Sequence, residues 1–385
     1  MRNKRIVPAA IAAFCIAFSG LAAAAGYFVS IPLRGAALPS GGGAFTATKI
    51  AAGYWHSLAI SGGKVWTTGY NAYGQLAVGD AADRIQWTDT GLAGVAAIEG
   101  GETSSFAIDS DGTLWAAGDN GSGELGLGDN VPRYSWTQTL AGVQAVAAGS
   151  YHTIALKADG TVWVTGWNGS GQLGLGDLID RNAWTQAPIT GVVAVAAGYA
   201  HSIALKSDGT VWVAGNNANG QLGLGNNIAR QAWTQAPIAA VAAISAGHTH
   251  SLALKTDGSV WSTGGNSAGQ LGLGDAANRN AWTQTPIAGV AAVAAGVGHS
   301  MALKGDGTLW VTGSNYGGQL GLGDTASRNA WTQTAITDVS AIAAGSMHSL
   351  ALKSSGALWG TGDAAGIGVA GSSYEYYSWV EVPAP

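Results

Sequence analysis

The feature that most constrains the fold of this chain is a unit of about 49 residues that recurs seven times. Its anchor position lies in the motif Gly-x-x-His-Ser-x-Ala-Leu and is filled by His56, Ser104, His152, His201, His250, His299 and His348. Two tryptophan series recur in step with the anchor. They are Trp66, Trp115, Trp163, Trp212, Trp261, Trp310 and Trp359, and Trp87, Trp136, Trp184, Trp233, Trp282, Trp331 and Trp379. Because both series have seven members, the 385 residues contain seven copies of one unit, although this length would otherwise suggest two or three domains.

Each unit is predicted to form four short strands, as the fourth unit illustrates. Its segments 193–197, 202–206, 210–214 and 232–238 alternate in polarity or are enriched in β-branched and aromatic residues, and none keeps a helical period. Asp208-Gly209 separates the second and third segments, and Asp-Gly is a strong hairpin signal because glycine accepts positive φ angles without steric cost. The same dipeptide recurs at Asp111, Asp159, Asp257 and Asp306.

Seven such units predict an all-β chain that closes into a seven-bladed β-propeller of four-stranded antiparallel blades. One unit cannot bury both faces of its sheet alone, whereas radial repetition packs each sheet between two neighbours and leaves only short edges. A linear β-solenoid is the rival architecture, but its coils are usually shorter and it does not require a fixed set of four-stranded units. The units are expected at about residues 46–93, 94–141, 142–190, 191–239, 240–288, 289–337 and 338–385.

The first 25 residues are predicted to be a signal peptide or an N-terminal membrane anchor, followed by a linker over residues 26–45. Three basic residues among the first five precede an uncharged stretch over residues 6–33. Ala23-Ala24-Ala25 suits cleavage by a signal peptidase, but the stretch is also longer than the about 20 apolar residues that span a bilayer. Either interpretation places the repeats outside the cytoplasm, whether secreted, periplasmic or at the cell surface, because the positive end stays inside.

The unit resembles the regulator of chromosome condensation repeat. The resemblance rests on Gly-x-x-His-Ser-x-Ala-Leu, then Asp-Gly-Thr-Val-Trp-x-x-Gly, then Asn-x-x-Gly-Gln-Leu-Gly-Leu-Gly-Asp, and it covers about residues 46–385. It implies a seven-bladed propeller, here of an exported bacterial type. The family includes a nuclear exchange factor for a small GTPase, a plant ultraviolet photoreceptor and a secreted bacterial inhibitor of β-lactamases, so the resemblance implies no single function.

Composition narrows the partners that such a chain can bind. The formal net charge of −5 argues against a nucleic-acid partner, because phosphate binding needs a clustered basic surface. Charged residues make up only 10% of the chain, so little electrostatic repulsion opposes self-association. A membrane is expected to be contacted only through the N-terminal segment, and no cofactor is expected.

The histidines do not predict a metal site. Each unit supplies one anchor histidine, and residues one blade apart are too far separated to share an ion. His248 and His250 are a closer pair, but two residues of one strand supply only part of a ligand set. We therefore expect no metal, and we expect each anchor histidine to begin a strand and to hydrogen-bond backbone between blades.

Two loop motifs are also predicted to be structural. Asp109-Ser110-Asp111-Gly112 resembles the start of a calcium loop but lacks the later ligands, and it fits the hairpin turn. Gly-Gln-Leu-Gly-Leu-Gly-Asp lacks the lysine of a P-loop and precedes no helix. In six units its Asp or Asn stands four residues before an arginine, which predicts loop-stiffening contacts: Asp80/Arg84, Asp129/Arg133, Asp177/Arg181, Asn226/Arg230, Asp275/Arg279 and Asp324/Arg328. No nucleophile, base and orienting residue can be assembled, so we expect no enzyme activity.

The predicted partner surface is formed by the loops between strands one and two and between strands three and four. These loops emerge at the same end of an antiparallel blade, and there the units differ most from one another. The predicted contact residues are of types enriched at protein interfaces: Tyr54, Trp55, Tyr70, Tyr73, Tyr151, Trp167, Tyr199, Tyr316 and Met347. Trp55 and Trp167 matter most, because neither belongs to the two structural tryptophan series.

We therefore expect a non-enzymatic scaffold that binds a protein partner which the sequence does not identify. The alternatives are a self-assembling surface or structural protein, and an enzyme or small-ligand site in the central channel. The seventh unit is one residue shorter between its two tryptophans and lacks the Gly-Gln-Leu loop with its arginine. This altered unit lies at the seam where the ring must close.

Overall fold

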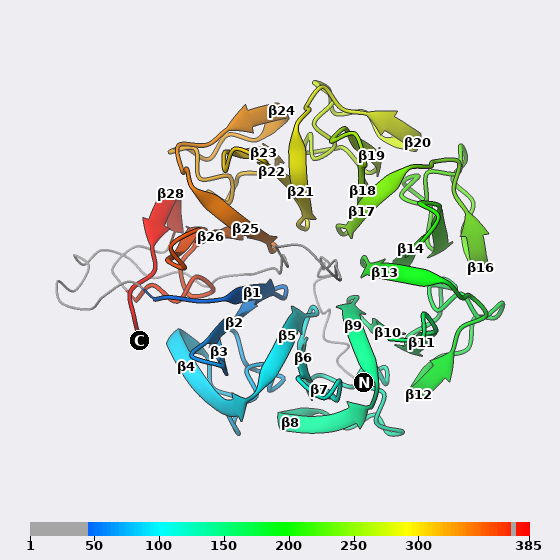
Figure 1. Cartoon of the computed structure of the whole chain (residues 1–385), viewed down its shortest axis with the longest axis horizontal. Helices are drawn as coiled ribbons and strands as arrows, with labels where there is room; N and C mark the ends of the chain where they lie inside the picture. Colours follow the sequence, from blue (N-terminus) through cyan, green and yellow to red (C-terminus); the bar gives the residue numbers. More distant parts are fainter. Residues whose placement is uncertain (1–44, 371–374) are drawn as a thin grey trace, which may run out of the picture.

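The computed structural model describes residues 45–370 and 375–385, and over these residues the chain is all-β. Twenty-eight strands form seven four-stranded antiparallel sheets there, and each sheet takes its strands in chain order. Figure 1 shows the sheets arranged as blades around a central axis, with the first strand of each blade innermost. The expected seven-bladed β-propeller is confirmed. The predicted signal segment 1–25 and most of the predicted linker lie outside the described residues.

The strands of the first four blades have the following bounds. Blade one contains β1 (Lys49–Ala52), β2 (His56–Ser61), β3 (Lys64–Gly69) and β4 (Arg84–Ala93). Blade two contains β5 (Val95–Gly100), β6 (Ser104–Asp109), β7 (Leu114–Gly118) and β8 (Arg133–Leu140). Blade three contains β9 (Val143–Ala148), β10 (His152–Lys157), β11 (Val162–Gly166) and β12 (Arg181–Gln186). Blade four contains β13 (Val192–Ala197), β14 (His201–Lys206), β15 (Val211–Gly215) and β16 (Arg230–Gln235).

The last three blades repeat this arrangement. Blade five contains β17 (Val241–Ala246), β18 (His250–Lys255), β19 (Val260–Gly264) and β20 (Arg279–Gln284). Blade six contains β21 (Val290–Ala295), β22 (His299–Lys304), β23 (Leu309–Gly313) and β24 (Arg328–Gln333). Blade seven contains β25 (Val339–Ala344), β26 (His348–Lys353), β27 (Leu358–Asp363) and β28 (Glu375–Glu381).

Local sequence explains the turns within a blade. Between β14 and β15, Asp208 Oδ1 accepts the Thr210 N–H at 3.0 Å, and Gly209 has φ +78°, a conformation that favours glycine. The predicted hairpin is therefore present. The fourth strand was expected to reach residue 238, but β16 ends at Gln235, because the Ala236 N–H bonds back to Val211 O at 2.8 Å and the chain then leaves the sheet.

Neighbouring blades are joined by a hydrogen bond from the anchor histidine. His201 Nε2 lies 3.0 Å from Ser251 Oγ of the next blade, and Ser251 donates in turn to Gln221 O at 2.7 Å. The same bond pairs His56 with Ser105, His152 with Ser202, His250 with Ser300, and His299 with Ser349. The expected bond between blades is present, but its partner is a serine hydroxyl that passes the bond on to backbone, and of these five histidines only His56 also bonds to backbone, at Ser104. Burial lowers the pKa of His201 to about 3, so its ring is neutral at pH 7.

A tryptophan of the outermost strand packs on the preceding blade. The indole of Trp282 covers Gly223, where an added Cβ would come within 2.4 Å of the indole nitrogen. The same contact pairs Gly126 with Trp184, Gly174 with Trp233, Gly272 with Trp331, Gly321 with Trp379, and Gly368 with Trp87. Between blades one and two, Ala77 replaces the glycine, and its own φ angle is +56°. The tryptophan that faces it, Trp136, is less buried than Trp282.

The ring closes through the same contacts that join the other blades. The Trp87 indole of blade one donates to Ile367 O of blade seven at 3.2 Å. Thr68 donates its hydroxyl to Ala365 O at 3.1 Å, as Thr361 donates to the corresponding loop of blade six. No sheet of the described residues combines strands from the two ends of the chain.

The residues before β1 form backbone hydrogen bonds with blade seven. The Phe45 N–H donates to Val382 O, and the Leu358 N–H donates to Phe45 O, both at 3.0 Å. The Phe45 ring is 3% exposed and lies 5.2 Å from the Trp87 ring. Phe45 therefore belongs to the propeller, although it falls within the linker predicted over residues 26–45.

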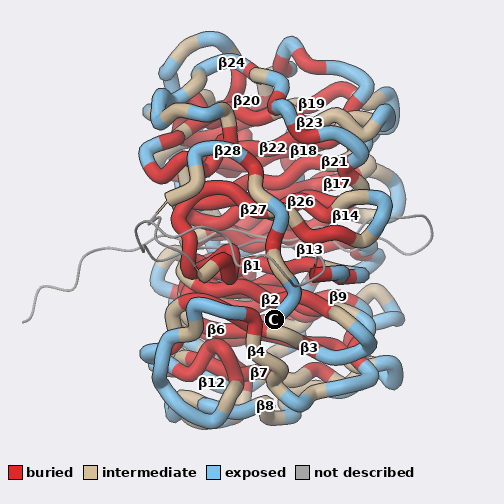
Figure 2. Tube along the Cα trace, turned by 90° about the vertical axis from the view of Figure 1, so that its left-hand side faces the viewer, coloured by how far each residue is buried: buried red, intermediate tan, exposed pale blue. Residues whose placement is uncertain are grey.

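The core lies between the blades. Apolar side chains of the inner three strands are buried against neighbouring sheets, and Figure 2 shows buried residues along the strands with exposed residues at the rims. Within residues 45–370 and 375–385 there is no helix that could cross a membrane.

Candidate protein-binding surface

The two ends of the propeller differ in how closely they follow the repeat. We call the end formed by the 1–2 and 3–4 loops the loop face; in blade four it comprises residues 198–200 and 216–229. The opposite end, formed by the 2–3 turns and the connections between blades, is called the turn face.

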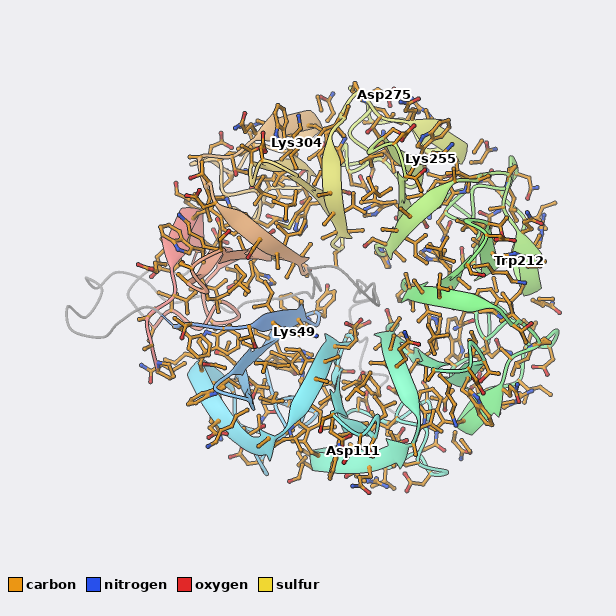
Figure 3. The ribbon with its side chains drawn as sticks, viewed as in Figure 1. Lys49, Asp111, Trp212, Lys255, Asp275 and Lys304 are labelled. Atoms are coloured by element: carbon orange, nitrogen blue, oxygen red, sulfur yellow. The ribbon has the colours of Figure 1, made fainter. Side chains whose placement is uncertain are left out.

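The turn face repeats one contact in blades three to seven. Lys206 Nζ lies 4.4 Å from the centre of the Trp212 ring, a cation–π geometry. Equivalent pairs at 4.2–4.8 Å are Lys157–Trp163, Lys255–Trp261, Lys304–Trp310 and Lys353–Trp359. Figure 3 shows Trp212, Lys255 and Lys304 distributed around the ring. Repetition of this kind indicates architecture more than the recognition of one partner.

The 3–4 loops are held by the predicted acid–arginine pairs. In blade three, Arg181 Nη2 lies 2.7 Å from Asp177 Oδ2, and Asn168 Oδ1 accepts the Leu173 N–H at 3.0 Å. The equivalent ion pairs are Asp80–Arg84, Asp129–Arg133, Asp275–Arg279 and Asp324–Arg328, and Asn226–Arg230 is a neutral counterpart. Because solvent screens these exposed pairs, their main effect is to fix the shape of the loop.

A continuous chain of aromatic rings crosses the loop face over blades three, four and five. Tyr151 lies between Trp167 and Tyr199, with ring centroids 6.4 Å and 6.1 Å away. Tyr199 packs edge-on against His248 at 4.7 Å. All four side chains are half-buried, so each offers part of its ring to solvent. We call Trp167, Tyr151, Tyr199 and His248 the aromatic chain; it contains three of the predicted contact residues and adds His248.

The same blades also carry exposed apolar side chains on the loop face. The Trp167 ring lies over Gly169 of its own loop, where an added Cβ would come within 2.6 Å of the indole. The 3–4 loops of blades three and four carry further apolar side chains that are 48–66% exposed: Leu178, Ile179 and Ile228. The loop face of these blades therefore exposes apolar side chains, which is a property of a contact surface.

The other predicted contact residues lie apart from the aromatic chain. Tyr70 and Tyr73 form an edge-on pair at 6.3 Å on the 3–4 loop of blade one. Tyr316 is 72% exposed on blade six, and Met347 of blade seven packs against the neighbouring Gly317.

Tyr54 differs from the rest of the predicted set. It is only 7% exposed, and its ring packs 4.4 Å from the half-buried ring of Trp55. Tyr54 therefore supports Trp55 and offers little surface of its own. Sequence reasoning placed both residues in the same loop but could not show which of the two rings is covered.

Blade two places three carboxyl groups beside the aromatic chain. Glu102 lies in the 1–2 loop, Asp119 begins the 3–4 loop, and Glu124 replaces the glutamine of Gly-Gln-Leu-Gly. Burial raises the pKa of Glu124 to about 8, and the charge of Asp119 adds to the effect. Burial likewise raises the pKa of Glu102 to about 7. Burial, and then the charge of Glu102, holds the pKa of Tyr151 above its usual range.

Sequence reasoning missed these acids as a group. One signal was available, because Glu124 is an acid at a position that is glutamine in five other units. The closeness of the three carboxyl groups to Tyr151 was not available, because it depends on how blade two meets blade three.

The residues considered for metal or phosphate binding have other partners. His248 contacts Tyr199, whereas His250 Nε2 lies 3.0 Å from Ser300 Oγ, so the two rings serve different contacts. In the turn that resembles a calcium loop, Asp109 Oδ1 accepts the Thr113 N–H at 2.8 Å. These contacts agree with the structural interpretation of both motifs.

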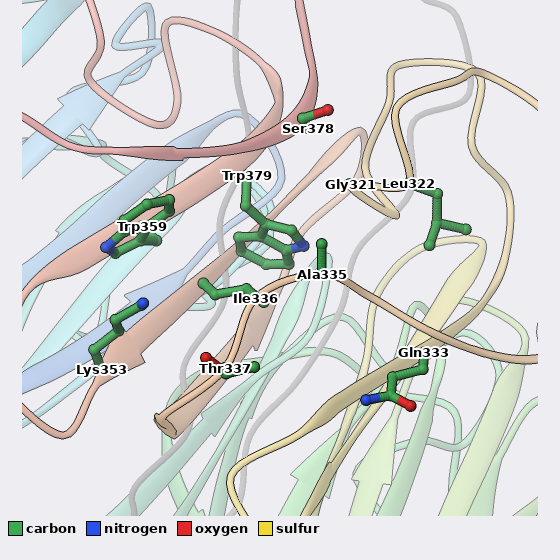
Figure 4. Close-up of a pocket in the computed structure, with 10 residues that line it drawn as sticks. All are labelled: Gly321, Leu322, Gln333, Ala335, Ile336, Thr337, Lys353, Trp359, Ser378 and Trp379. Carbon is green, nitrogen blue, oxygen red and sulfur yellow. The ribbon is translucent and has the colours of Figure 1, made fainter.

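The cavities among the described residues include two between the outer strands of neighbouring blades. One, of about 390 Å³, opens between blades six and seven, and Figure 4 shows it lined by Trp359, Trp379, Ile336 and Lys353 among others. The other, of about 380 Å³, lies between blades one and two beside Ala77 and Trp136. Neither of these two cavities includes a residue of the aromatic chain.

Comparisons with known proteins agree on this architecture. A family model described as the Regulator of chromosome condensation (RCC1) repeat matches residues 111–156, 159–205, 208–254, 257–303 and 306–352, more than half of the chain. A second model of the same description matches residues 47–75, 143–172, 192–221, 241–270 and 290–319. No curated protein matches the sequence.

Solved structures with this fold share little sequence with the chain. Yeast RCC1 (Prp20), in its complex with Kap60, has a TM-score of 0.76 and 20% identity, over 86% of this chain and 85% of that protein. Prp20p from Saccharomyces cerevisiae, solved in work on its binding to Gsp1p and histones, has a TM-score of 0.71 and 22% identity over 78% and 81%. Human WBSCR16 has a TM-score of 0.72 and 22% identity over 89% and 99%. The repeat motifs, the seven-bladed ring and the family models agree, and the chain belongs to the regulator of chromosome condensation (RCC1) repeat family.

Proposed function

We propose that this chain is an exported, non-enzymatic scaffold that binds a protein partner through its loop face. The observation that carries the proposal is the aromatic chain, a run of four ring side chains in contact across three blades. Half-exposed aromatic side chains on a rigid support are the side chains that most often dominate protein interfaces. The turn face instead repeats the same lysine–tryptophan pair in blades three to seven.

Two further observations support a binding role. The relatives with solved structures include yeast RCC1 (Prp20) in complex with Kap60, and Prp20p, whose binding to Gsp1p and histones has been examined. Within the described blades, five anchor histidines bond to a serine of the next blade, which favours a structural role over a catalytic one. A protein partner and the absence of enzyme activity remain parts of the proposal.

The test compares capture by two faces of the same protein. The full chain is immobilised and exposed to the culture fluid and envelope fraction of its native cells, and bound proteins are quantified by mass spectrometry. Tyr151→Ala with Tyr199→Ala should lose at least about 90% of a specific partner, since truncated aromatic hot spots cost 2 kcal/mol or more. Lys206→Ala with Lys255→Ala, on the turn face, should capture as much as the unaltered chain. Equal loss from both double variants would contradict the proposal.

Export is the second part of the proposal. It is supported by the basic N-terminus and the uncharged stretch that follows, both outside the described residues. N-terminal sequencing of the protein from native cells should begin at Gly26 if a signal peptide is removed, and at residue 1 or 2 in a membrane fraction if the segment is kept as an anchor. Recovery of the intact chain from the cytoplasm would contradict export.

Self-assembly is a second candidate function, because the loop face also exposes Ile179, Ile228 and Tyr316 at 66%, 66% and 72%. Light scattering after gel filtration distinguishes it from binding of a different protein. A mass that rises with protein concentration, and that Tyr316→Ser returns to one chain, favours assembly. A single-chain mass at all concentrations favours a different partner.

A further inference from the structure

The two cavities between outer strands occupy the same place in the repeat. We call them the one–two cavity and the six–seven cavity, after the blades that enclose them. Their lining residues correspond position by position, and three of the pairs are Gly91 and Ala335, Ser135 and Ser378, and Trp136 and Trp379. The two cavities can therefore be compared with the same place between the other blades.

Each cavity lies beside the smallest residue that the unit has at one position. This position, four residues after the tryptophan of the outermost strand, is Gly91 in blade one and Ala335 in blade six. Every other unit has a larger residue there: Leu140, Pro188, Pro237, Pro286 and Pro383. A Cβ added at Gly91 would meet no atom within 4 Å apart from its chain neighbours, so the space beside it is open. The missing side-chain atoms leave room between the blades.

Both cavities also gain a hydroxyl group from the following blade. Ser135 and Ser378 stand directly before the tryptophan that packs on the preceding blade, and both are exposed. The other units have Gln86, Ala183, Ala232, Ala281 and Ala330 at this position. The sheet does not need the hydroxyl, since alanine serves in four units. A small residue and a serine thus coincide between two pairs of blades and between no other pair, which points to a ligand.

The six–seven cavity has an apolar floor and a polar rim. Figure 4 shows Trp379 and Ile336 at its centre, and these side chains are 8% and 5% exposed. Gln333, Thr337 and Ser378 lie around them and are exposed, so their amide and hydroxyl groups are open to a ligand. Small-molecule sites have this composition, with apolar walls and a few polar groups that fix orientation. A volume of about 390 Å³ is at the small end of such sites and suits a single ring.

The charged groups that line the two cavities differ in sign. Lys353 lines the six–seven cavity, where its Nζ lies 4.7 Å from the centre of the Trp359 ring. Asp89 lines the one–two cavity and pairs with Lys64 at 2.5 Å. An ionic ligand would meet unlike charges in the two places, so the shared features select a neutral one. Those features are a tryptophan, an aliphatic neighbour and a serine hydroxyl, which suit a ring with an apolar C–H face and hydroxyl groups at its edge.

We propose that the one–two and six–seven cavities are binding sites for hexopyranose residues of a neutral polysaccharide. A hexopyranose has the required form, because its C–H groups make an apolar face and its hydroxyl groups project from the edge. The inference goes beyond the proposed function, since neither cavity contains a residue of the aromatic chain. A segment of protein is the competing occupant and is an outcome of the test.

The test follows single tryptophans of the full chain by fluorine NMR after fluorotryptophan has been incorporated. The resonances of Trp136, Trp379, Trp282 and Trp331 are assigned by replacing each residue in turn with phenylalanine. The neutral probes are maltohexaose, cellohexaose and mannohexaose, which differ in linkage or in sugar. Hexagalacturonate is the charged probe, and the peptide Gly-Leu-Ser-Gly stands for a protein segment.

We expect at least one neutral hexasaccharide to shift the resonances of Trp136 and Trp379, with half-saturation at about 0.1–1 mM, as for small ligands that bury few atoms. Hexagalacturonate should need a higher concentration. Trp282 is the internal control, because it holds the same place between blades four and five, where Pro237 and Ala281 stand. Its resonance should not move.

Variants that copy residues from elsewhere in the chain should fold and should remove the sites one at a time. Ala335→Pro with Ser378→Ala gives the six–seven cavity the residues found between blades five and six. It should abolish the sugar-dependent shift of Trp379 and leave that of Trp136. Ser135→Ala should raise the half-saturation concentration at Trp136 by about two- to tenfold, the effect of one lost hydrogen bond.

The reverse substitutions should create a third site. Pro286→Ala with Ala330→Ser places the small residue and the serine between blades five and six, where Trp331 packs on Gly272. The Trp331 resonance should then shift with the same sugar that shifts Trp379. In the unaltered chain it should not respond.

Several results would overturn the inference. They are no shift of Trp136 or Trp379 by any neutral probe up to about 10 mM, an equal shift of Trp282, or a Trp379 shift that survives Ala335→Pro with Ser378→Ala. Tighter binding of hexagalacturonate than of every neutral probe would show that charge, and not the shared neutral features, selects the ligand. Shifts caused by the peptide and by no sugar would assign the cavities to a segment of protein.

Discussion

Blade four and blade two have the same four-stranded pairing, but they meet the next blade differently. In blade four, His201 bonds to Ser251 of blade five, and the loop carries the neutral Gln221. In blade two, Ser104 replaces the histidine and Glu124 replaces the glutamine. The comparison teaches that the ring tolerates the loss of one histidine bond. It also shows that the blade without the histidine is the one that places acids beside the aromatic chain.

Lowering the pH should produce the largest effect on stability, because it protonates the anchor histidines between the blades. Blade two is spared, since it has Ser104 in place of the histidine. Burial lowers the pKa of His201 to about 3, and of His152 likewise, from an ordinary value of about 6.5 in the unfolded chain. Between these values the unfolded chain binds more protons than the folded one. The stability is therefore complete above pH 6.5 and is lost as the pH falls toward 3.

Urea denaturation at pH 7, 6, 5 and 4, followed by tryptophan fluorescence, measures this decline. The acids with a raised pKa, Glu102, Glu124 and Asp363, oppose it, since their protonated form is favoured in the folded state. Five histidines share the lowered value of about 3, so they should outweigh these three acids. A free energy of unfolding that stays constant from pH 7 to pH 4 would show that protonating the anchor histidines does not destabilise the fold.

The next largest effect should come from making blade four like blade two. His201→Ser removes a fully buried ring and its bond to Ser251, and should lower the free energy of unfolding by about 2–4 kcal/mol. The reverse change, Ser104→His, should raise it by about 1 kcal/mol if the new ring reaches Thr153. Urea denaturation at pH 7 measures both. A loss below about 1 kcal/mol for His201→Ser would mean that packing alone holds the seam.

The sequence predicted the parts of this comparison that repeat, and it missed the parts that depend on neighbouring blades. The spacing of the histidines and tryptophans was enough for the seven blades, and Asp208-Gly209 was enough for a turn. The partner of His201 was not predictable, because Ser251 lies one repeat further along the chain. For the same reason the contact of Tyr151 with Tyr199 became visible only once the blades were packed side by side.

The buried acid of blade two should have a smaller effect that depends on pH. Burial raises the pKa of Glu124 to about 8 from an ordinary 4.5, so its protonated form stabilises the fold at low pH and this contribution is lost as the pH rises toward 8. Glu124→Gln should therefore stabilise the chain by about 1–3 kcal/mol at pH 8.5, the cost of an unsatisfied buried polar group, and by much less at pH 5.

The matched control for Glu124→Gln lies in blade four. Gln221→Glu should destabilise the chain at pH 8.5 and have little effect at pH 5, since it installs the same carboxyl group at the same place in the repeat. Urea denaturation at the two pH values measures both variants. An effect of Glu124→Gln that does not change between them would show that Glu124 is ionised throughout the range and that a cation already neutralises it.

The smallest effect on stability should come from the aromatic chain, which belongs to the loop face and not to the seams. Trp167 is half-buried and lies over Gly169 of its own loop, so Trp167→Ala should lower the free energy of unfolding by less than about 1 kcal/mol. Trp282→Ala is the contrasting change, because this indole is 8% exposed and packs on Gly223 of the preceding blade, and it should cost about 3–5 kcal/mol. Thermal and urea denaturation measure both variants. Equal losses of unfolding free energy in the two variants would place Trp167 in the core, and the loop face would then not differ from the contacts between blades. A small loss for Trp167→Ala, together with lost capture of the partner, would assign Trp167 to recognition.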